Sequence, residues 1–335
     1  MIYLGRSTGL SDPGRKRRRN EDAWVLQPPL FAVADGMGGA RGGEIASRVA
    51  ATALGEAVDG SGEERVVALI KKANRQVFER ARDDADATGM GTTITVALVE
   101  DGVVAIGHVG DSRAYLIRDQ KVEQLTEDHS LVAELVRSGR LSPEEAEIHP
   151  QRSVITRVLG VDPDVDVDSF TVEASAGDVF LICSDGLTSM IDDETILGIV
   201  EPRRDDLNSA AKELIGAANR SGGEDNITVV CFEMTDTPPE PPAETKAMPV
   251  VQAPAPPAAE PDEDTLSGLE GVPTVQTTVI SPEQAQAQAT ADGTEPEQHE
   301  QPKERFGMRA ARLVIALAVV AALGLLVYWL FGQSR

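Results

Sequence analysis

The stretch 30–44, LFAVADGMGGARGGE, constrains the fold of this chain more than any other. Five apolar residues are followed at once by Asp35 and Gly36 and then by a glycine-rich turn. An apolar run of that length that ends in turn residues is typical of a buried β-strand. The strand would deliver the Asp35 carboxylate at its exposed end, and a helix is expected to begin near Gly43. Taken alone, the stretch is equally consistent with an acidic turn that caps this helix.

Residues 1–235 alternate between strand-like and helix-like segments. Strands are predicted at 2–8, 22–27, 30–35, 91–99, 102–109, 113–118, 121–125, 168–174, 178–184 and 226–233. Long helices are predicted at 43–58, 63–85 and 205–220, and shorter ones at 130–138 and 192–200. Hairpin signals such as Asp101-Gly102 join neighbouring strands, and the helices come in pairs. This pattern favours an α+β fold with antiparallel sheets over a βαβ repeat, with helices placed to cover both faces of two stacked sheets.

Acidic residues recur at the ends of the predicted strands. Four of them stand beside a glycine, a serine or an asparagine: Asp35, Asp111, Asp185 and Asp225. Any one of them alone is typical of a turn, where aspartate is common. Four at corresponding positions instead indicate a set of convergent oxygen ligands, which suits Mg²⁺ or Mn²⁺. The sequence therefore predicts a divalent-metal site where these strands end.

Charge and cysteine content restrict the partners of the chain. The formal net charge is −24, and nucleic acid is excluded as a partner because phosphate binding needs a basic face. The run GMGGARGG is not a nucleotide-binding loop, because no Lys-Ser or Lys-Thr pair follows it. The two cysteines, Cys183 and Cys231, lie in apolar strand-like runs, which indicates buried thiols in a reducing compartment and not zinc ligands.

The chain beyond residue 235 differs in composition from the rest. Residues 236–308 are rich in Pro, Ala, Glu and Gln, which predicts a disordered linker. Within the segment 309–335, the nineteen residues 313–331 carry no charge, so they are long enough to cross a bilayer as one helix. A buried core helix is disfavoured, since the run has no polar face. Basic residues precede the span and only Arg335 follows it, which predicts a single-pass protein of the cell membrane with residues 1–235 in the cytoplasm.

Six motifs, in order along residues 1–235, resemble those of one enzyme family. They are Arg17-x-x-Asn20-Glu21-Asp22, Asp35-Gly36-Met37-Gly38-Gly39, Gly91-Thr92-Thr93, Gly107-His108-Val109-Gly110-Asp111-Ser112-Arg113, Cys183-Ser184-Asp185-Gly186-Leu187 and Asp225-Asn226-Ile227-Thr228. The chain resembles the PPM (type 2C) metal-dependent Ser/Thr protein phosphatases in their bacterial membrane-anchored form. The resemblance implies a four-layer α-β-β-α sandwich of two antiparallel sheets flanked by helix pairs, with a metal centre between the sheets.

The resemblance also implies a ligand set for two Mn²⁺ or Mg²⁺ ions. Asp35 would bridge both ions, and the carbonyl of Gly36 would bind one of them. Asp185 and Asp225 would complete the set, and Asp111 would help to hold a possible third ion. Two such ions lower the pKa of a bridging water and aim it at phosphorus.

The residues around this ligand set receive further roles from the same resemblance. Glu21 and Asp22 would hold waters on the metals, and Asn226 would stand just outside the ligand set and support it. Arg17 would clamp the substrate phosphate, because a guanidinium matches phosphate geometry with two parallel hydrogen bonds. Arg17 lies within the basic run 15–19, whose other members either steer anionic substrates or form a solvated loop.

One position departs from many eukaryotic members of the family, which have histidine where this chain has Met37. Methionine cannot donate a proton to the leaving group, so that role falls to metal-bound water or goes unfilled. His108 and His129 are the remaining candidates, but His108 within a strand is expected to be structural and His129 to order its own loop. The segment 136–160 resembles the flap beside the active site in this family. Its arginines either contact phosphopeptides or are merely solvated: Arg137, Arg140 and Arg152.

The leading hypothesis is hydrolysis of phosphoserine and phosphothreonine in proteins by a metal-activated water, in opposition to a Ser/Thr kinase at the same membrane. A phosphatase that acts on one small regulator is an alternative, although such proteins usually carry a sensory domain and none is visible here. A membrane-anchored scaffold that binds phosphoproteins without turnover is a third. Loss of a ligand aspartate would favour the scaffold, yet Asp35, Asp185 and Asp225 are all present.

Overall fold

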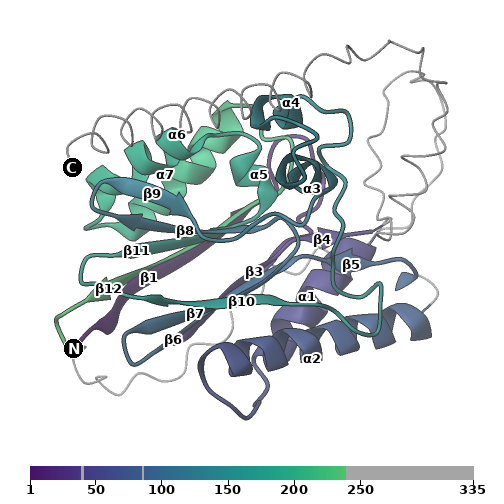
Figure 1. Cartoon of the computed structure of the whole chain (residues 1–335), viewed down its shortest axis with the longest axis horizontal. Helices are drawn as coiled ribbons and strands as arrows, with labels where there is room; N and C mark the ends of the chain where they lie inside the picture. The colour runs from purple at the N-terminus through teal and green to yellow at the C-terminus, as the bar shows by residue number, and fades with distance from the viewer. Residues whose placement is uncertain (39–40, 85–86, 239–335) are drawn as a thin grey trace, which may run out of the picture. The chain divides into compact units, whose positions relative to one another are not determined.

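A computed structural model describes residues 1–38, 41–84 and 87–238, in which two five-stranded antiparallel sheets face each other (Figure 1). The first sheet has the order β1 (Tyr3–Asp12), β12 (Ile227–Thr235), β11 (Val179–Cys183), β8 (Arg113–Arg118) and β9 (Lys121–Gln124). The second has the order β10 (Asp168–Glu173), β7 (Val103–Val109), β6 (Ile94–Glu100), β3 (Leu30–Ala34) and β2 (Ala23–Gln27). A separate two-stranded ladder pairs β4 (Gly36–Met37) with β5 (Gly91–Thr92).

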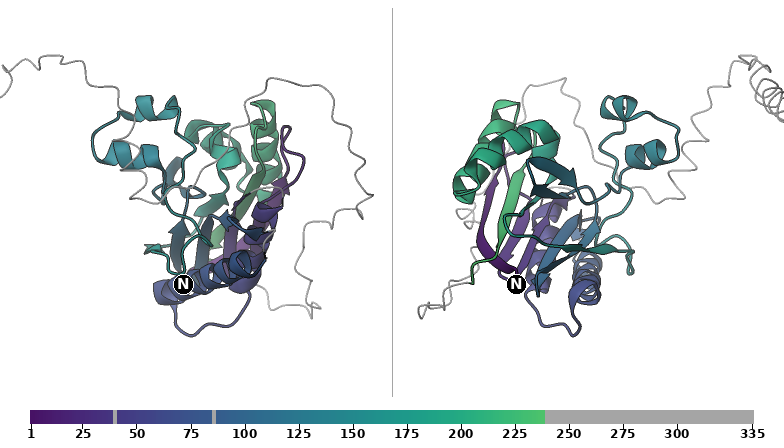
Figure 2. Two further views of the ribbon diagram at one scale, coloured as in Figure 1. Left: turned by 90° about the vertical axis from the view of Figure 1, so that its right-hand side faces the viewer. Right: turned by 60° about the vertical axis from the view of Figure 1, so that its left-hand side comes forward.

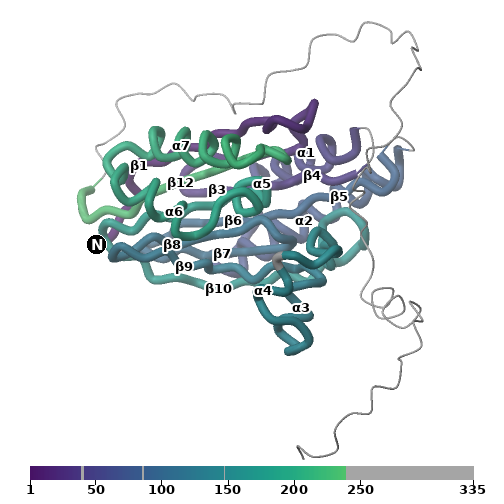
Figure 3. Tube along the Cα trace, turned by 90° about the horizontal axis from the view of Figure 1, so that it is seen from above, coloured from purple at the N-terminus to yellow at the C-terminus, as the bar shows by residue number. Residues whose placement is uncertain are grey.

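Helices cover the outer face of each sheet. Helices α1 (Gly42–Leu54) and α2 (Gly62–Asp83) pack on the second sheet. Over the first sheet lie α5 (Asp185–Thr188), α6 (Asp193–Val200) and α7 (Leu207–Arg220), with the 3₁₀ turn η2 (Glu201–Arg203) between the last two. Figure 3 shows α6 and α7 above the strands of this sheet. Two short helices, α3 (Leu131–Arg137) and α4 (Pro143–Glu147), project from the body of the sandwich (Figure 2).

Three buried clusters of apolar side chains separate these layers. One lies between the second sheet and its helices, one between the first sheet and its helices, and one between the two sheets. In the middle cluster the ring of Phe232 stacks on Phe31 at 4.3 Å and on Phe180 at 5.0 Å between ring centroids. The predicted α+β fold of antiparallel sheets is confirmed, and Cys183 and Cys231 are buried free thiols as expected.

Most of the strand and helix predictions are right to within a few residues, and the exceptions have physical causes. β1 continues to Asp12 and not to residue 8, because its polar second half pairs along its whole length with the buried strand β12. The strand predicted at 91–99 divides at Thr93, whose backbone N–H donates to the Asp35 carbonyl. The helix predicted at 43–58 ends at Leu54, before Gly55. Helices α4 and α5 are too short to show helical periodicity in sequence.

The predictions for the C-terminal part fall almost entirely outside the described residues. The linker at 236–308 is described only as far as residue 238, and the membrane anchor at 309–335 is not described. Among the residues that the structure does describe, no helix is both long enough and apolar enough to cross a membrane.

The packing between the sheets makes a direct prediction for stability. Phe232 is fully buried between two other rings, so Phe232→Ala should lower the free energy of unfolding by about 3–5 kcal/mol through lost burial and the cavity left behind. Urea denaturation followed by tryptophan fluorescence measures the change. Exposed Arg75→Ala on α2 serves as the control and should lie within about 0.5 kcal/mol of the parent. A similarly small effect of Phe232→Ala would contradict the packing described.

Candidate metal centre

The predicted acidic residues gather at one end of the sandwich. Antiparallel register sets Val33 of β3 opposite Thr95, which in turn lies opposite His108 near the end of β7. In the other sheet, Cys183 at the end of β11 pairs with Val229 near the start of β12. The loops beyond these strand ends carry the acidic residues and face one another. The carboxylate of Asp35 consequently experiences repulsion from four others: Asp22, Asp111, Asp185 and Asp225.

The backbone of Asp35 is held in place by two threonines. Its carbonyl oxygen accepts the N–H of Thr93 at 2.9 Å and the hydroxyl of Thr92 at 2.8 Å, while its own N–H donates to the Thr93 hydroxyl at 3.1 Å. The next residue must be glycine, because a Cβ on Gly36 would lie 2.1 Å from the Gly43 carbonyl oxygen. The strand end is thereby fixed with the Asp35 side chain directed to the acidic group.

Asp111 stands in a turn that is braced from both sides. The N–H of Gly110 donates to Nδ1 of His129 at 3.0 Å, and the N–H of His129 donates back to the Gly110 carbonyl at 2.7 Å. On the other side the hydroxyls of Ser112 and Thr93 lie 2.7 Å apart. The same threonine therefore fixes both the Asp35 strand end and the Asp111 turn.

The two histidines of this region serve the framework, as predicted. Nδ1 of His108 lies 2.9 Å from the Thr95 hydroxyl and Nε2 lies 3.1 Å from the Glu127 carbonyl. Burial lowers the pKa of His108 to about 3, so its imidazole is neutral. His129 has its Nε2 3.1 Å from Asp168, and burial lowers its pKa as well. Neither ring is directed to the acidic group.

Asp22 joins the two sheets below the acidic group. It precedes β2 of the second sheet, and its carboxylate accepts the hydroxyls of Ser184 at 2.8 Å and Thr228 at 2.5 Å from the first sheet. Burial raises its pKa to about 7, with repulsion from Asp185 and Asp225 adding to the effect. Its second oxygen is buried without a hydrogen-bond partner among the described residues.

Asp185 and Asp225 lie beside the ends of two neighbouring strands of the first sheet, β11 and β12. Asp185 opens α5 directly after β11, and the following residue must be glycine, because a Cβ on Gly186 would lie 2.1 Å from the Asn226 carbonyl oxygen. Asp225 precedes β12 and forms an ion pair of 2.7 Å with Arg17. Arg17 thus lies at the edge of the acidic group, where its sequence motif predicts it.

Asn226 anchors the loop that carries Arg17. Its amide nitrogen donates to the carbonyls of Pro13 at 3.0 Å and Arg19 at 2.9 Å, and its amide oxygen accepts the N–H of Glu21 at 2.7 Å. These three bonds hold the loop backbone against the start of β12. The structure therefore gives this amide a positioning task in the loop that carries Arg17.

Burial and crowding of carboxylates together determine the electrostatics of the site. Burial, followed by repulsion from neighbouring carboxylates, raises the pKa of Asp35 and of Asp111 well above their usual range and that of Asp185 to about 6. Glu21, half-buried beside them, also has a raised pKa, with burial as the main cause. The arrangement stores unfavourable charge that a cation would relieve.

The donor set fits hard divalent cations. Three buried carboxylate oxygens without a hydrogen-bond partner in the described part of the chain belong to this group, one each on Asp22, Asp111 and Asp185. Oxygen-only sets of this kind suit Mg²⁺ and Mn²⁺. In their present rotamers no three acidic, histidine or cysteine side chains of residues 1–38, 41–84 and 87–238 are disposed to hold one ion. Shared coordination therefore requires small side-chain rotations, for example release of Asp225 from Arg17.

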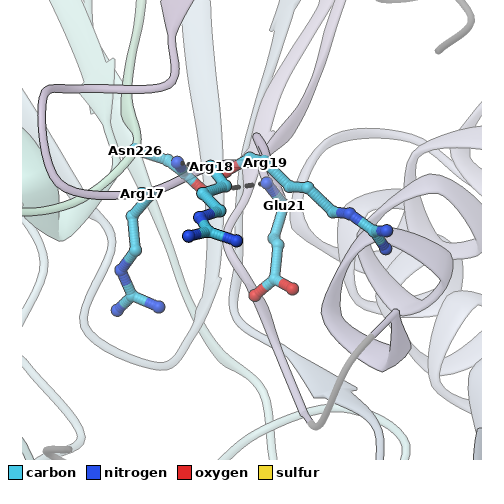
Figure 4. A pocket seen from close by; sticks show the side chains of 5 residues that line it. All are labelled: Arg17, Arg18, Arg19, Glu21 and Asn226. Carbon is cyan, nitrogen blue, oxygen red and sulfur yellow. Dashed lines mark hydrogen bonds between the residues drawn. The ribbon is translucent and has the colours of Figure 1, made fainter. Parts of the chain in front are cut away.

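A pocket of 260 Å³ opens beside the acidic group and is lined by Arg17, Arg18, Arg19, Glu21 and Asn226 (Figure 4). The segment 136–160, which resembles the flap of the family, includes α4. Bridges between Ser130 and Ile155 and between Thr92 and Leu159 tie its neighbourhood to the framework. Of the flap arginines, Arg137 pairs with Glu127 at 3.0 Å.

Sequence reasoning missed the hydroxyl side chains that hold the carboxylates in place. Part of their signal was present, because a serine or threonine lies within three residues of an aspartate in three of the six motifs. The residues concerned are Thr92, Thr93, Ser112, Ser184 and Thr228. Their role depends on contacts between strands that are distant in sequence, which no local pattern reveals.

Comparison with known proteins places this arrangement in context. The family model described as Protein phosphatase 2C matches residues 15–219. The serine/threonine phosphatase stp of Listeria welshimeri is 41% identical over 236 residues, which cover 67% of this chain and 93% of that protein. The serine/threonine protein phosphatase PstP of Mycobacterium tuberculosis is 40% identical over 230 residues, which cover 68% of this chain and 44% of that longer protein.

Solved structures of bacterial serine/threonine phosphatases superpose on this chain. The crystal structure of the Mycobacterium tuberculosis phosphatase PstP/Ppp superposes with a TM-score of 0.66 at 39% identity, covering 69% of this chain and 99% of that one. The PstP catalytic domain in complex with two manganese ions superposes with a TM-score of 0.63 at 36% identity, covering 70% and 100% of the two chains.

The raised pKa values make a prediction about metal binding. A carboxyl group whose pKa is higher in the folded than in the unfolded protein favours folding when it is protonated. The folded protein loses this contribution to its stability as the pH rises from the pKa of the unfolded state to that of the folded state. With the pKa of Asp185 raised to about 6 and that of Asp22 to about 7, the chelated protein should lose stability from about pH 4 to about pH 7. Mn²⁺ should therefore restore stability much more at pH 8 than at pH 5. At about a hundredfold excess over Kd, the Tm should rise by about 5–10 °C at pH 8.

Differential scanning fluorimetry with Mn²⁺ or with chelator at both pH values measures this difference. Asp185→Asn should remove most of the pH dependence of the metal effect, whereas Asp59→Asn on an exposed loop should retain it. An equal Tm shift at both pH values in the parent protein would count against the acidic group as the metal site.

Proposed function

This chain belongs to the protein phosphatase 2C family, and we propose that it hydrolyses phosphoserine and phosphothreonine in proteins with the help of Mn²⁺ or Mg²⁺. The observation that carries the proposal is the gathering of the motif carboxylates at one end of the sandwich, where three buried oxygens have no partner among the described residues. Relatives that cover the whole catalytic region are named serine/threonine phosphatases, and one was crystallised with two manganese ions.

Asp35, Asp185, Asp225 and the carbonyl of Gly36 are the proposed ligands of two divalent ions, and Asp111 that of a third. When bound, such ions lower the pKa of a water and neutralise charge on the phosphoryl oxygens. The surrounding structure holds the ligands in position. Thr93 hydrogen-bonds both to the backbone of Asp35 and to Ser112 in the turn that carries Asp111. Glu21 and Asp22 border the same space and are proposed to orient waters there.

Arg17 is proposed to bind the substrate phosphate. Its guanidinium lies at the rim of the acidic group, is about half exposed, and pairs with Asp225. A cation on Asp225 would weaken that ion pair, and the guanidinium could then present two N–H groups to a phosphate. The Arg17–Asp225 pair thus keeps the arginine in place until metal and substrate are both present.

The leaving oxygen of serine or threonine needs a proton, and no side chain at position 37 can supply it, because Met37 has no acidic hydrogen. Both histidines of the region are engaged in the framework and have lowered pKa values. We propose that this proton comes from water. Activity should accordingly show no dependence on the titration of a histidine.

The proposed setting is the cytoplasmic face of the cell membrane. The uncharged segment 313–331 is the proposed single-pass anchor, and residues 236–308 are the proposed linker between anchor and enzyme. A membrane Ser/Thr kinase and its phosphorylated targets would then lie within reach of the linker. The proposed role is to oppose that kinase.

The test is hydrolysis of a phosphothreonine peptide by the full-length protein with Mn²⁺, with Mg²⁺ and with excess chelator. Metal-dependent phosphate release is expected, and Asp35→Asn should reduce kcat by about 1,000-fold or more, since several kcal/mol of charge stabilisation are lost and 1.36 kcal/mol is tenfold in rate. Asp59→Asn, on an exposed loop, should retain full activity.

Circular dichroism of Asp35→Asn separates loss of chemistry from loss of fold. If the Asp35→Asn variant is folded and as active as the parent, Asp35 is not a ligand of the catalytic metal ions. Absence of release by the folded parent with either metal would instead favour a phosphoprotein-binding scaffold.

The anchor is tested by removing it. Deletion of residues 309–335 should move the protein from the membrane fraction to the soluble fraction after high-speed centrifugation, with kcat on a soluble phosphopeptide changed by less than about twofold, because the sandwich closes its core without these residues. The control is the truncated protein centrifuged without membranes, which should stay in the supernatant. If it does so but still sediments when membranes are present, residues 313–331 are not the anchor.

A further inference from the structure

A run of five basic residues lies on the surface next to the proposed active site. Residues 15–19, RKRRR, are all exposed, in a chain whose net charge is −24. Only Arg17 belongs to the family motif, so the other four are not accounted for by the proposed phosphate clamp. Because these four residues lie beside a site for phosphorylated proteins, their positive charge can influence which substrates the enzyme prefers.

The backbone of this basic run follows a fixed path. The N–H groups of Arg15 and Lys16 both donate to the Gly223 carbonyl, at 2.7 and 3.1 Å. At the other end the Arg19 carbonyl accepts the amide of Asn226 at 2.9 Å. The turn before the run has Gly14 at φ +75°, packed so closely that a Cβ would lie 2.1 Å from the Asp225 carbonyl oxygen. The charges are therefore displayed from an anchored loop.

Arg18 is placed to meet a substrate already held by Arg17. Figure 4 shows the side chains of Arg17 and Arg18 descending on the same side as Glu21, whereas Arg19 points away. Arg17 pairs with Asp225, but Arg18 takes part in no ion pair that the structure describes. Both arginines line the 260 Å³ pocket. The exposed guanidinium of Arg18 lies in the same pocket as Arg17, so it is suited to bind a second anion.

We propose that Arg18 binds a second anionic group on the substrate, so that the enzyme prefers phosphorylated residues with another phosphorylated or acidic residue nearby. This inference rests on the proposed phosphatase function and names its substrate class. Arg17 and Arg18 are adjacent in the chain and line one pocket, and an extended peptide advances about 3.3–3.6 Å per residue. The second group is therefore expected close in sequence to the residue that is dephosphorylated.

The chemistry favours a phosphate over a carboxylate as the second group. A phosphorylated side chain carries a charge of about −1.5 to −2 with three acceptor oxygens, and a guanidinium can bind two of them at once. Because the pocket is open to solvent, the interaction is screened by salt over about 8 Å at physiological ionic strength. The preference should therefore be moderate and should decline as salt is added.

The test compares kcat/KM of the full-length protein on four phosphothreonine peptides of one sequence. The residue two positions from the phosphothreonine is alanine, glutamate, a second phosphothreonine or lysine. The enzymes are the parent, Arg18→Gln, Arg18→Lys and, as a matched control, Arg75→Gln, whose exposed arginine lies on α2.

The parent should prefer the doubly phosphorylated peptide over the alanine peptide by about fivefold to tenfold, with glutamate in between and lysine last. Arg18→Gln should bring this ratio close to one, chiefly through KM, because a group away from the reacting atoms binds ground state and transition state alike. Arg18→Lys should retain part of the ratio, and Arg75→Gln should match the parent.

Two results overturn the inference while leaving the function intact: equal kcat/KM on the four peptides by the parent, or an unchanged ratio in Arg18→Gln. A preference for the glutamate peptide equal to that for the doubly phosphorylated one would identify a carboxylate as the natural second group, within the proposal. Failure of the parent to hydrolyse any of the peptides would overturn the proposed function, and this inference with it.

Discussion

Mutual repulsion among buried carboxylates is the constraint on which the rest of this structure depends. Burial is the main cost of charging Asp22, Asp35, Asp111 and Asp185, and Asp35 is in addition repelled by four other aspartates. Such a group can be kept together only if a stable framework surrounds it and if cations neutralise it. The large apolar layers between and outside the sheets provide the first condition. The carboxylate oxygens that lack a hydrogen-bond partner in the described part of the chain are positions at which cations could bind and neutralise the charge.

The framework meets this constraint with hydrogen bonds that cross from sheet to sheet. Asp22 of one sheet accepts hydroxyls from Ser184 and Thr228 of the other, and Asn226 binds three backbone groups of the loop that carries Arg17. These bonds set the distance between the two halves of the acidic group. Asn226 also anchors the basic run through the Arg19 carbonyl, so the acidic group and the surface proposed to bind the substrate depend on the same residue.

Local patterns in the sequence were sufficient to predict the strands, the main helices and the acidic positions. Apolar runs that end in Asp-Gly mark β3 and β11 because a buried strand must stop where the chain reaches solvent. The roles of Thr93 and Asn226 were not predictable in this way, because both depend on partners far along the chain. The Arg17–Asp225 ion pair likewise joins residues that are 208 positions apart. Such contacts exist only after the sheets have packed.

The central claim is that the carboxylates at the end of the sandwich bind a pair of divalent ions. Anomalous diffraction at the manganese edge, from crystals grown with Mn²⁺, tests it most directly. The account predicts two strong peaks between the ends of β3, β11 and β12, each about 2.0–2.2 Å from oxygens of Asp35, Asp185 or Asp225. Peaks confined to other surfaces, or none at this position in a crystal that contains manganese, would contradict it.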